Sequence, residues 1–415
     1  MPACRGKDSQ MRDHAQPAVS TAPPPQHTGP HPWVRLRSAS SHPFIYKRML
    51  AGADPAARSG DVVAVYDRQD RLFGHGLYHA RSQIAVRMLS HGPRPIDESF
   101  FRERLGQAIA WRERLFRNDD KTNVYRLVHA EGDGLSGLIV ERYAEWIAIE
   151  LFSLGMYRQI ELIRQVLTEL TGINRFVVRA DDRVEQMEGF HVAPELSDAV
   201  PPTLEIAESG LRFRVDLRGG HKTGFFADQR ENRRRLASLA SGADLLDVCC
   251  YTGGFGLYAK TLGAANAVTG VDLDENAVEL AKRNAKLNQQ RIKYVHADAF
   301  SYLRQMQTSG HRYDVVVLDP PKFVSNRDEF ADGARKYGDL NTLGMTVVKP
   351  GGLLVTCSCS GSVSRLAFLD IVKASANRAG RSLQIVDQTG AGPDHPVMAN
   401  CPESEYLKVV WARVM

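Results

Sequence analysis

Cysteines and aspartates are the residues of this sequence with the clearest chemical use. Cys357 and Cys359 follow an apolar run, and Asp319 opens the stiff segment Asp319-Pro-Pro-Lys-Phe323. A cysteine thiolate is nucleophilic and leaves readily, so it can add to an electron-poor carbon and depart afterwards. A carboxylate can accept hydrogen bonds from a nitrogenous ring and stabilise charge that builds up there. Because either cysteine alone is also typical of an inert buried thiol, the elements that position these residues must decide.

Residues 245–256, Leu-Leu-Asp-Val-Cys-Cys-Tyr-Thr-Gly-Gly-Phe-Gly, predict an apolar strand, a glycine-rich turn and the start of a helix. In open α/β sheets such a turn lets a nucleoside cofactor lie against the backbone. The next strand, residues 266–272, ends in Asp272, the position from which a carboxylate takes both ribose hydroxyls. Asp298 and Asp319 follow at the ends of later strands. The sequence therefore predicts a nucleoside site along one edge of a sheet.

Two other interpretations of this turn are weaker. A dehydrogenase requires the spacing G-x-G-x-x-G, whereas the glycines here are Gly253, Gly254 and Gly256, crowded by Tyr251 and Thr252. That crowding suits a compact sulfonium ligand better than a pyrophosphate. A turn without any ligand is disfavoured by the aspartates at successive strand ends. In a nucleoside site we expect Gly253 and Gly254 to let the ligand approach, while the N-terminus of the next helix favours its carboxylate.

The pattern of the chain divides it into four segments. Residues 1–30 are rich in proline and have almost nothing to bury, which predicts disorder. Residues 31–95 hold short β-like runs between Asp and Gly turns, which predict a small β-barrel. Residues 96–203 begin with a long amphipathic helix and predict a middle α+β domain. In residues 204–415 strands and helices alternate, which predicts an α/β fold with a parallel sheet whose last strand, Tyr406–Val414, pairs antiparallel.

Length, cysteine use and charge limit the class of protein. At 415 residues the chain is long enough for two or three domains. Its apolar stretches are far shorter than the ~20 residues of a membrane-spanning helix, and its N-terminus lacks the apolar core of a signal peptide. Six cysteines without metal-ligand or disulfide spacing fit a reducing cytosol, so we expect a cytoplasmic protein with no metal and no membrane partner. The net charge of +5 is mild, but arginines crowd residues 81–117 and 230–235, where they indicate either phosphate contacts or solvated helix faces.

Further motifs occur in order along the chain. In the N-terminal part they are Ser41-His-Pro-Phe-Ile-Tyr46, Gly60-Asp-Val-Val-Ala-Val-Tyr-Asp67 and Gly76-Leu-Tyr-His-Ala-Arg-Ser-Gln-Ile84; in the C-terminal half they are Gly220-His-Lys-Thr-Gly224, Asp228-Gln-Arg230, Tyr251-Thr-Gly-Gly-Phe255, Asp319-Pro-Pro-Lys-Phe323, Ser358-Cys-Ser-Gly361, Asp394-His-Pro396 and Tyr406-Leu-Lys408. The set resembles that of S-adenosylmethionine-dependent methyltransferases. More specifically, from about residue 35 onward the chain resembles the bacterial large-subunit ribosomal RNA cytosine-C5 methyltransferases of type I. One departure is Phe44-Ile-Tyr46, where family members usually carry Trp-Val-Phe.

The resemblance implies a fold, a cofactor and a substrate. The fold would be a class I methyltransferase with strands ordered 3-2-1-4-5-7-6, after an RNA-binding PUA barrel and the middle domain. S-adenosyl-L-methionine would be held by Tyr251, Thr252, Gly253, Gly254, Asp272 and Asp319, with Asp298 accepting from the adenine amino group. Cys359 would attack C6 of a cytosine in large-subunit ribosomal RNA, and Asp319 would bind that base. The RNA would lie near His42, Tyr78 and Arg81, with its phosphates near Lys222, Arg230 and Lys322.

Two other functions stay open. An exocyclic-amine methyltransferase uses an Asp-Pro-Pro-aromatic loop and needs no cysteine; here Lys322 stands at the aromatic position and Phe323 follows it. A non-catalytic RNA-binding assembly factor would bind no cofactor, which the intact carboxylates and Cys359 disfavour. The oligomeric state is also open, with a homodimer as one of the states.

Overall fold

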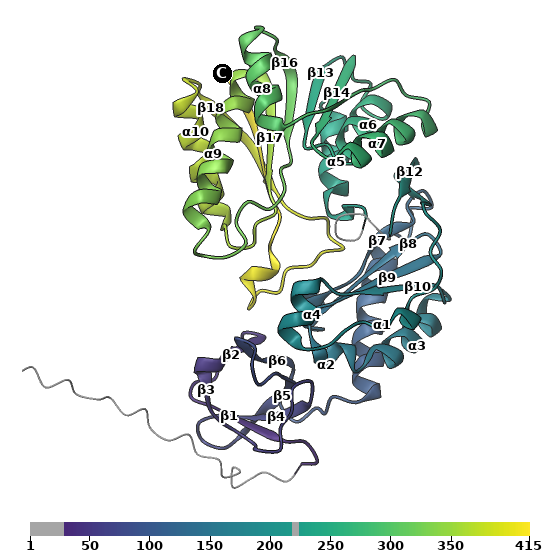
Figure 1. The fold of residues 1–415 in the computed structure, drawn as a ribbon, viewed down its shortest axis with the longest axis vertical. Helices are drawn as coiled ribbons and strands as arrows, with labels where there is room; N and C mark the ends of the chain where they lie inside the picture. Colours follow the sequence, from purple (N-terminus) through teal and green to yellow (C-terminus); the bar gives the residue numbers. More distant parts are fainter. Residues whose placement is uncertain (1–28, 218–223) are drawn as a thin grey trace, which may run out of the picture.

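The structure is a computed structural model that describes residues 29–217 and 224–415. Three units follow one another along the long axis of the molecule (Figure 1). They are an N-terminal barrel, a middle unit and a C-terminal sheet. The disorder expected for residues 1–30 lies outside the described residues, except at residues 29 and 30, and so does Lys222.

The barrel is a curled six-stranded sheet, in agreement with the β-barrel predicted for this segment (Figure 1). Successive side chains of a strand point to opposite faces, so the alternating apolar residues of the segment fill its interior. Val34, Ile45, Val63 and Val86 are fully buried there. The strands, ordered β2-β6-β5-β4-β1-β3, are β1 (Trp33–Leu36), β2 (Phe44–Tyr46), β3 (Leu50–Ala53), β4 (Val62–Tyr66), β5 (Leu72–Tyr78) and β6 (Ile84–His91), with the 3-10 turn η1 (Lys47–Met49).

The middle unit packs helices on a four-stranded sheet with the order β10-β9-β8-β7. Its long helix begins where the Asp97 carboxylate accepts the N–H of Phe100 at 2.9 Å, as an N-cap does. Phe101 and Leu105 of this helix share a core with Ile163. The long helix expected at the start of this unit is α1 (Glu98–Leu115). The unit continues with β7 (Val124–His129), η2 (Ala130–Asp133), β8 (Leu138–Tyr143), β9 (Trp146–Leu151), α2 (Leu154–Tyr157), α3 (Ile160–Thr171), β10 (Phe176–Arg179), α4 (Asp182–Glu188) and η3 (Pro194–Leu196), in agreement with the predicted α+β domain.

A hairpin of β11 (Leu204–Glu208) and β12 (Leu211–Val215) precedes the seven-stranded C-terminal sheet. The strand order β15-β14-β13-β16-β17-β19-β18 confirms the expected 3-2-1-4-5-7-6 arrangement, and β19 pairs antiparallel with both neighbours. The strands are β13 (Asp244–Val248), β14 (Ala267–Asp272), β15 (Lys293–His296), β16 (Tyr313–Leu318), β17 (Val348–Ser358), β18 (Leu383–Thr389) and β19 (Lys408–Val414).

Helices cover both faces of the C-terminal sheet, so its strands carry apolar side chains on both faces. Leu245 of β13 packs in a core with α5 and α6, whereas its neighbour Leu246 packs in a core with α8, α9 and α10. The helices are η4 (Ala227–Gln229), α5 (Arg230–Ser238), α6 (Gly254–Thr261), α7 (Glu275–Leu287), α8 (Ala299–Thr308), α9 (Phe330–Thr346), α10 (Arg365–Arg378) and η5 (Pro402–Ser404).

Residues 390–407, here called the crossing segment, leave β18, run out toward the other two units and return as β19 (yellow in Figure 1). At the middle unit, the buried Arg112 donates to the Asp394 carbonyl at 2.7 Å. At the barrel, His42 Nε2 bonds Glu403 at 2.9 Å. His42 Nδ1 already accepts the N–H of Phe44 at 2.9 Å, so Nε2 carries the proton that Glu403 receives.

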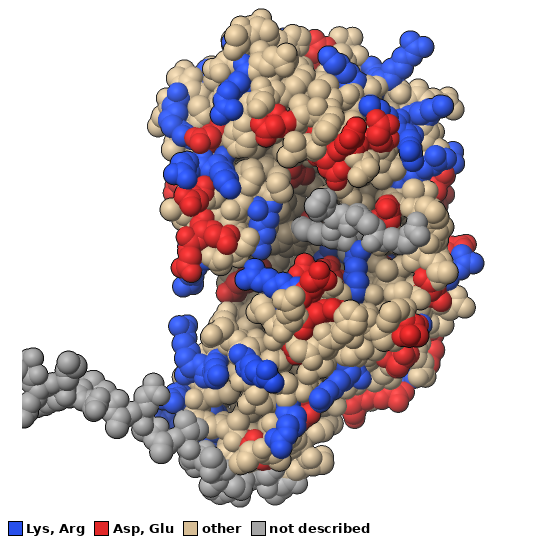
Figure 2. Space-filling model, in the orientation of Figure 1, with Lys and Arg blue, Asp and Glu red and all other residues tan. Residues whose placement is uncertain are grey.

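Lys and Arg side chains gather on both sides of an indentation between the barrel and the C-terminal sheet, on the face that Figure 2 shows. Within the described part of the chain, no helix is both long enough and apolar enough to cross a membrane.

Candidate active site

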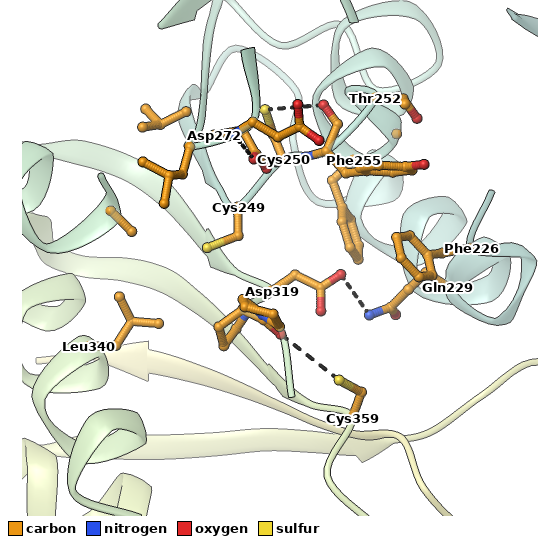
Figure 3. A pocket seen from close by; sticks show the side chains of 18 of the residues that line it. Phe226, Gln229, Cys249, Cys250, Thr252, Phe255, Asp272, Asp319, Leu340 and Cys359 are labelled. Atoms are coloured by element: carbon orange, nitrogen blue, oxygen red, sulfur yellow. Dashed lines mark hydrogen bonds between the residues drawn. The ribbon is translucent and has the colours of Figure 1, made fainter. Parts of the chain in front are cut away.

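A cavity of about 580 Å³ opens at the carboxyl ends of the C-terminal sheet's strands (Figure 3). Ligands of open α/β sheets bind at this edge, and the volume is that of a small-molecule site. Its walls come from the ends of β13 to β17, together with η4 and β19. The lining residues include Phe226, Asp228, Gln229, Cys249, Tyr251, Thr252, Gly254, Phe255, Asp272, Asp298, Ala299, Phe300, Asp319, Lys322, Phe323, Leu340, Cys359 and Leu407.

The turn after β13 is strained and holds a carboxylate in place. Cys249 and Tyr251 have φ angles of 60° and 49°, which are costly for residues with a side chain. This conformation points the N–H of Tyr251 at Asp272 Oδ2, 2.7 Å away, while the N–H of Asp274 donates to Oδ1 at 2.9 Å. Each oxygen of Asp272 keeps a lone pair, so the carboxylate can accept from two ligand hydroxyls.

The two glycines of the turn are needed for a different reason than the sequence suggests. A Cβ at Gly253 would lie 2.3 Å from the Tyr294 hydroxyl oxygen, and one at Gly254 would lie 2.6 Å from Arg233 Nε. Gly253 also has a φ of +84°. Packing and turn geometry therefore exclude side chains at these two positions, a requirement that adds to the expected approach of a ligand. Gly254 still lines the cavity.

Asp298 has a structural role that the sequence did not reveal. It is the N-cap of α8, where Oδ1 accepts the N–H of Ser301 at 2.9 Å. The residue is half-buried and lines the cavity beside Ala299 and Phe300. Because one oxygen serves the helix, the other is left to accept from a ligand amine.

Asp247 is a fully buried carboxyl beneath the turn, which sequence reasoning missed. Its Oδ2 accepts the N–H of Gly256 at 3.0 Å and so ties β13 to α6. Burial raises the pKa of Asp247 to about 7, and the charges of Asp319 and Asp272 act in the same direction, against that hydrogen bond. The sequence signal that could have revealed Asp247 is an acidic residue inside the apolar run of β13.

The cavity is acidic. Burial raises the pKa of the Cys249 thiol well above its usual range, and four surrounding aspartates raise it further. Negative charge concentrated in a partly buried site favours a cationic ligand. The four residues are Asp272, Asp319, Asp247 and Asp298.

The two candidate nucleophiles differ in access to the cavity. Cys357 lies within β17 and is fully buried, and burial raises its thiol pKa well above the usual range. Cys359 follows the end of the strand, is half-buried and lines the cavity, with Sγ 4.0 Å from the carbonyl oxygen of Pro320 (Figure 3). Of these two cysteines, Cys359 is the one that a ligand in the cavity can reach.

Side chains distant in sequence surround Asp319 and Cys359. Gln229 Nε2 donates to Asp319 Oδ2 at 3.0 Å (Figure 3). The buried Lys408 donates to the carbonyl oxygens of Ser360 at 2.6 Å and Tyr406 at 2.8 Å. Burial lowers the pKa of Lys408 to about 8, although the charge of Cys359 opposes this shift. Gln229 and Lys408 belong to motifs noted in the sequence, but their spacing gave no sign of these contacts.

The residues expected to contact RNA lie in two places. His42 and Tyr78 are half-buried and Arg81 is exposed on the barrel, whereas Lys322 is exposed at the cavity. His42 is engaged with Glu403 of the crossing segment.

The structure corrects the expectation that Arg230 contacts RNA phosphate. Its guanidinium is fully buried and pairs at 2.7 Å with Asp394, which is also fully buried, so it is not available to phosphate. Burial raises the pKa of Asp394, but the neighbouring His395 and the Arg230 pair outweigh it and keep that pKa below its usual range. Nearby, the buried Arg233 pairs with Glu208 at 2.7 Å. These two residues of the second arginine group are therefore taken up by internal ion pairs.

The first arginine group, residues 81–117, also holds internal ion pairs. Arg112 is fully buried against Asp133 at 2.6 Å, and Arg94 pairs with Glu103 at 2.6 Å. Arginines that complete the protein's own contacts are poor candidates for phosphate contacts. The clustering of arginines in the sequence did not distinguish internal ion pairs from phosphate contacts.

Comparison with known proteins decides the family. Residues 133–408 match the S-adenosylmethionine-dependent methyltransferase family, and residues 37–91 match the PUA-like domain. The chain belongs to this methyltransferase family. S-adenosylmethionine is accordingly the cofactor of this methyltransferase, and its fold is that of class I with an N-terminal PUA-like domain.

Relatives resemble the methyltransferase over most of its length. The "Ribosomal RNA large subunit methyltransferase I" of Alteromonas mediterranea is 37% identical over 372 residues, which cover 88% of this chain and 93% of the relative. The protein of the same description from Klebsiella pneumoniae is 36% identical over 380 residues, covering 90% and 94%. A solved methyltransferase from Streptococcus mutans is similar in fold, with a TM-score of 0.78 and 19% identity over 92% of this chain and 99% of that one.

The cavity of the methyltransferase fits its cofactor. The Asp272 carboxylate has free lone pairs for ribose hydroxyls, and the acidic surroundings of Cys249 suit a sulfonium cation. Phe255 and Phe300 supply apolar wall for a ring. These features come from residues that the sequence placed at successive strand ends.

Proposed function

We propose that this methyltransferase forms 5-methylcytosine in large-subunit ribosomal RNA through a covalent bond between Cys359 and C6 of the base. The observation that carries the proposal is a thiol at the cavity wall beside the Asp319-Pro-Pro segment, 4.0 Å from the Pro320 carbonyl. The relatives named for large-subunit ribosomal RNA methylation support the choice of RNA.

Cofactor binding is assigned to the strand ends of the cavity. Asp272 accepts from the ribose hydroxyls, and Asp298 accepts from the adenine amino group through its remaining oxygen. Tyr251, Thr252, Gly253 and Gly254 form the turn against which the methionine part lies, and Asp319 faces the sulfonium end. The N-terminus of α6 follows this turn, and its dipole favours the ligand carboxylate.

Cytosine C5 is a weak nucleophile, so the ring must first be activated at C6. The Cys359 thiolate forms a bond to C6, and the displaced electron pair makes C5 nucleophilic. When bound, S-adenosylmethionine supplies the methyl group that C5 takes up. A base then removes the C5 proton, the C–H electron pair restores the C5–C6 double bond, and the thiolate leaves C6.

Asp319 and Lys408 assist Cys359 in this scheme. Asp319 binds the amino group and N3 of the cytosine, and it holds a proton at N3 while negative charge builds on the ring. Lys408 holds the turn after Cys359 through the Ser360 carbonyl, and its positive charge favours the thiolate. Both residues are fixed by the protein before any substrate arrives.

The RNA is proposed to run from the barrel to the cavity. His42, Tyr78 and Arg81 contact it on the barrel, and the exposed Lys322 meets phosphate beside the target base. Basic side chains on both sides of the indentation in Figure 2 support this path. Phosphate contacts of this kind make binding salt-dependent.

An exocyclic-amine methyltransferase is the second candidate, because the Asp-Pro-Pro segment lines the cavity in either case. The aromatic residue that this reaction needs is one position late, and the Phe323 ring packs against Tyr337 at 4.9 Å. Cys359 would then have no chemical role.

Product analysis separates the candidates. Ribosomal RNA from cells that lack the protein is methylated with the purified enzyme and labelled cofactor, digested to nucleosides and examined by mass spectrometry. We expect 5-methylcytidine. Label in N4-methylcytidine or a purine would overturn the proposal, and absence of any label would favour a non-catalytic RNA-binding protein.

A further inference from the structure

A continuous chain of hydrogen bonds runs from the edge of the C-terminal sheet to Asp319. Trp411 Nε1 of β19 donates to Thr389 Oγ1 at 2.8 Å, and Thr389 Oγ1 bonds Asn232 Oδ1 at 2.6 Å. Asn232 Nδ2 then bonds Gln229 Oε1 at 2.7 Å, and Gln229 Nε2 bonds Asp319 Oδ2 at 3.0 Å. Trp411, Asn232 and Gln229 are at most 2% exposed.

The direction of the bonds follows from groups that can act in only one way. An indole N–H can only donate, so the Thr389 oxygen accepts from Trp411. The Gly390 carbonyl can only accept, and it lies 2.9 Å from Asn232 Nδ2, so the amide nitrogen of Asn232 faces Gly390 and Gln229. The Asn232 oxygen then faces Thr389 and accepts its proton. Gln229 must accept from Asn232, and so it presents N–H to Asp319.

We infer that Gln229 is a positioning residue whose amide is turned toward Asp319 by a one-way chain of hydrogen bonds that begins at the Trp411 indole. The inference rests on the proposed function only in that Asp319 acts on the target base. A donor that cannot reverse favours the ionised form of the Asp319 carboxylate and fixes its orientation. A reversed amide would instead place an oxygen against that carboxylate.

Titratable groups surround Asp319. Its charge raises the pKa of Asp247, Cys249 and Cys357, so these groups lie close enough to interact with it. The Gln229 amide also lowers the pKa of Cys357, in contact with that thiol. Gln229 thus offers its two amide protons to the two groups behind the target base.

Thr389→Val tests the chain at a distance from the cavity. The variant keeps the shape of the side chain but removes the hydroxyl that links Trp411 to Asn232 and leaves the buried Asn232 oxygen without its donor. We expect kcat to fall about tenfold to a hundredfold, as for a buried polar group that loses its partner. The acidic limb of the pH–activity profile should move to higher pH, while cofactor affinity stays unchanged. Thr389→Ser, which restores the hydroxyl, should recover both kcat and the profile.

Thr168→Val is the matched control, since that hydroxyl bonds a carbonyl of its own helix at 2.9 Å in the middle unit. It should leave kcat and the pH profile as they are. Wild-type kcat and profile in Thr389→Val, or failure of Thr389→Ser to recover them, would overturn the inference.

Gln229→Glu tests the other end of the chain and covers the case in which Thr389→Val does not fold. The introduced carboxyl group can donate to Asp319 only while it is protonated. Activity should therefore need a lower pH, and the optimum pH of activity should move downward. An unchanged optimum would overturn the inference. The product identified by mass spectrometry is a separate readout: a product other than 5-methylcytidine, with the Thr389 effects intact, would reject the proposed function and leave the chain standing.

Discussion

The two halves of the cavity are built in different ways. In the half formed by β13 to β15, Asp272 accepts N–H groups from its own turn and from the turn after the adjacent strand β13, two and 21 residues away, and Asp298 accepts one from three residues away. In the half formed by β16, β17 and β19, Asp319 is held by Gln229 from 90 residues away, and the turn after Cys359 by Lys408 from 48 residues away. The first half is organised by its own turns and the second by the completed fold.

This difference predicts a different defect for substitutions in each half of the cavity. A substitution in the first half should weaken cofactor binding and leave the rest of the site in place. A substitution in the second half should leave the cofactor bound and abolish or misdirect the chemistry, because its partners come from α5, β18 and β19. Four substitutions test that division, and they are taken from the largest expected effect to the smallest.

Cys359→Ala should have the largest effect, because it removes the only bond to C6 in the proposed reaction. We expect methyl transfer to fall by at least about a thousandfold, with cofactor affinity unchanged. RNA that contains 5-fluorocytosine should trap a covalent adduct with the wild-type enzyme, since fluorine cannot leave C5 as a proton, and none with this variant. Cys357→Ala is the control and should still form the adduct. Near-full transfer by Cys359→Ala would place the chemistry elsewhere.

Arg230→Met should lower stability rather than RNA affinity. It leaves the Asp394 carboxylate buried without its 2.7 Å partner, which costs about 3–5 kcal/mol of unfolding free energy. Urea unfolding measures the loss, and the exposed Arg234→Met should change it by less than about 1 kcal/mol. If Arg230→Met kept its stability and bound RNA more weakly, Arg230 would be a phosphate ligand after all.

Asp272→Ala should act on the cofactor half alone. Loss of the ribose hydrogen bonds should weaken cofactor binding by roughly 1.5–3 kcal/mol, about tenfold to a hundredfold, in calorimetry. Asp370→Ala, on the exposed side of α10, is the control with unchanged affinity. Wild-type affinity in a folded Asp272→Ala protein would remove this residue from the cofactor site.

Asp247→Asn should change the pH dependence of stability. The pKa of Asp247 is about 7 in the folded protein and 3.8 ordinarily, so between these values the folded state holds a proton that the unfolded state has released. Stability conferred by that proton is present below pH 4 and is lost as pH rises toward 7, by roughly 1 kcal/mol per pH unit. Unfolding curves of the cofactor-free variant should lack this slope. An identical slope in both proteins would contradict the buried proton.

The same division explains what the sequence could predict. Alternation of strands and helices from Asp244 onward predicted the parallel C-terminal sheet, because each βαβ unit follows local periodicity, whereas the order of its strands came from the family resemblance. Asp272 and Asp298 were identified because strand ends converge at one edge. Gln229, Asn232 and Thr389 were not, because a hydrogen bond between residues 157 apart leaves no periodic trace.

Arginine is the clearest failure of sequence reasoning. Arg81 and Arg230 look alike in a basic stretch, yet one is exposed and the other fully buried. The burial of Arg230 depends on Asp394, which is 164 residues further along. Charge counts cannot distinguish an arginine that meets solvent from one that has an internal carboxylate.

The crossing segment bears on how the molecule can move. Its contacts with the middle unit are buried, since the Asp394 carbonyl accepts from Arg112 at 2.7 Å and the Asp394 carboxylate accepts the N–H of Arg126 at 3.0 Å. Its contacts with the barrel are less buried: the half-buried His42 donates to the exposed Glu403, and the half-buried Asn400 donates to the Ser41 carbonyl. Separation of the middle unit from the C-terminal sheet would leave buried charges without partners, whereas release of the barrel exchanges partly exposed hydrogen bonds for bonds to water. Hinge motion is therefore cheapest where the barrel meets residues 400–403, so the mouth between barrel and sheet can widen while the cavity itself stays rigid.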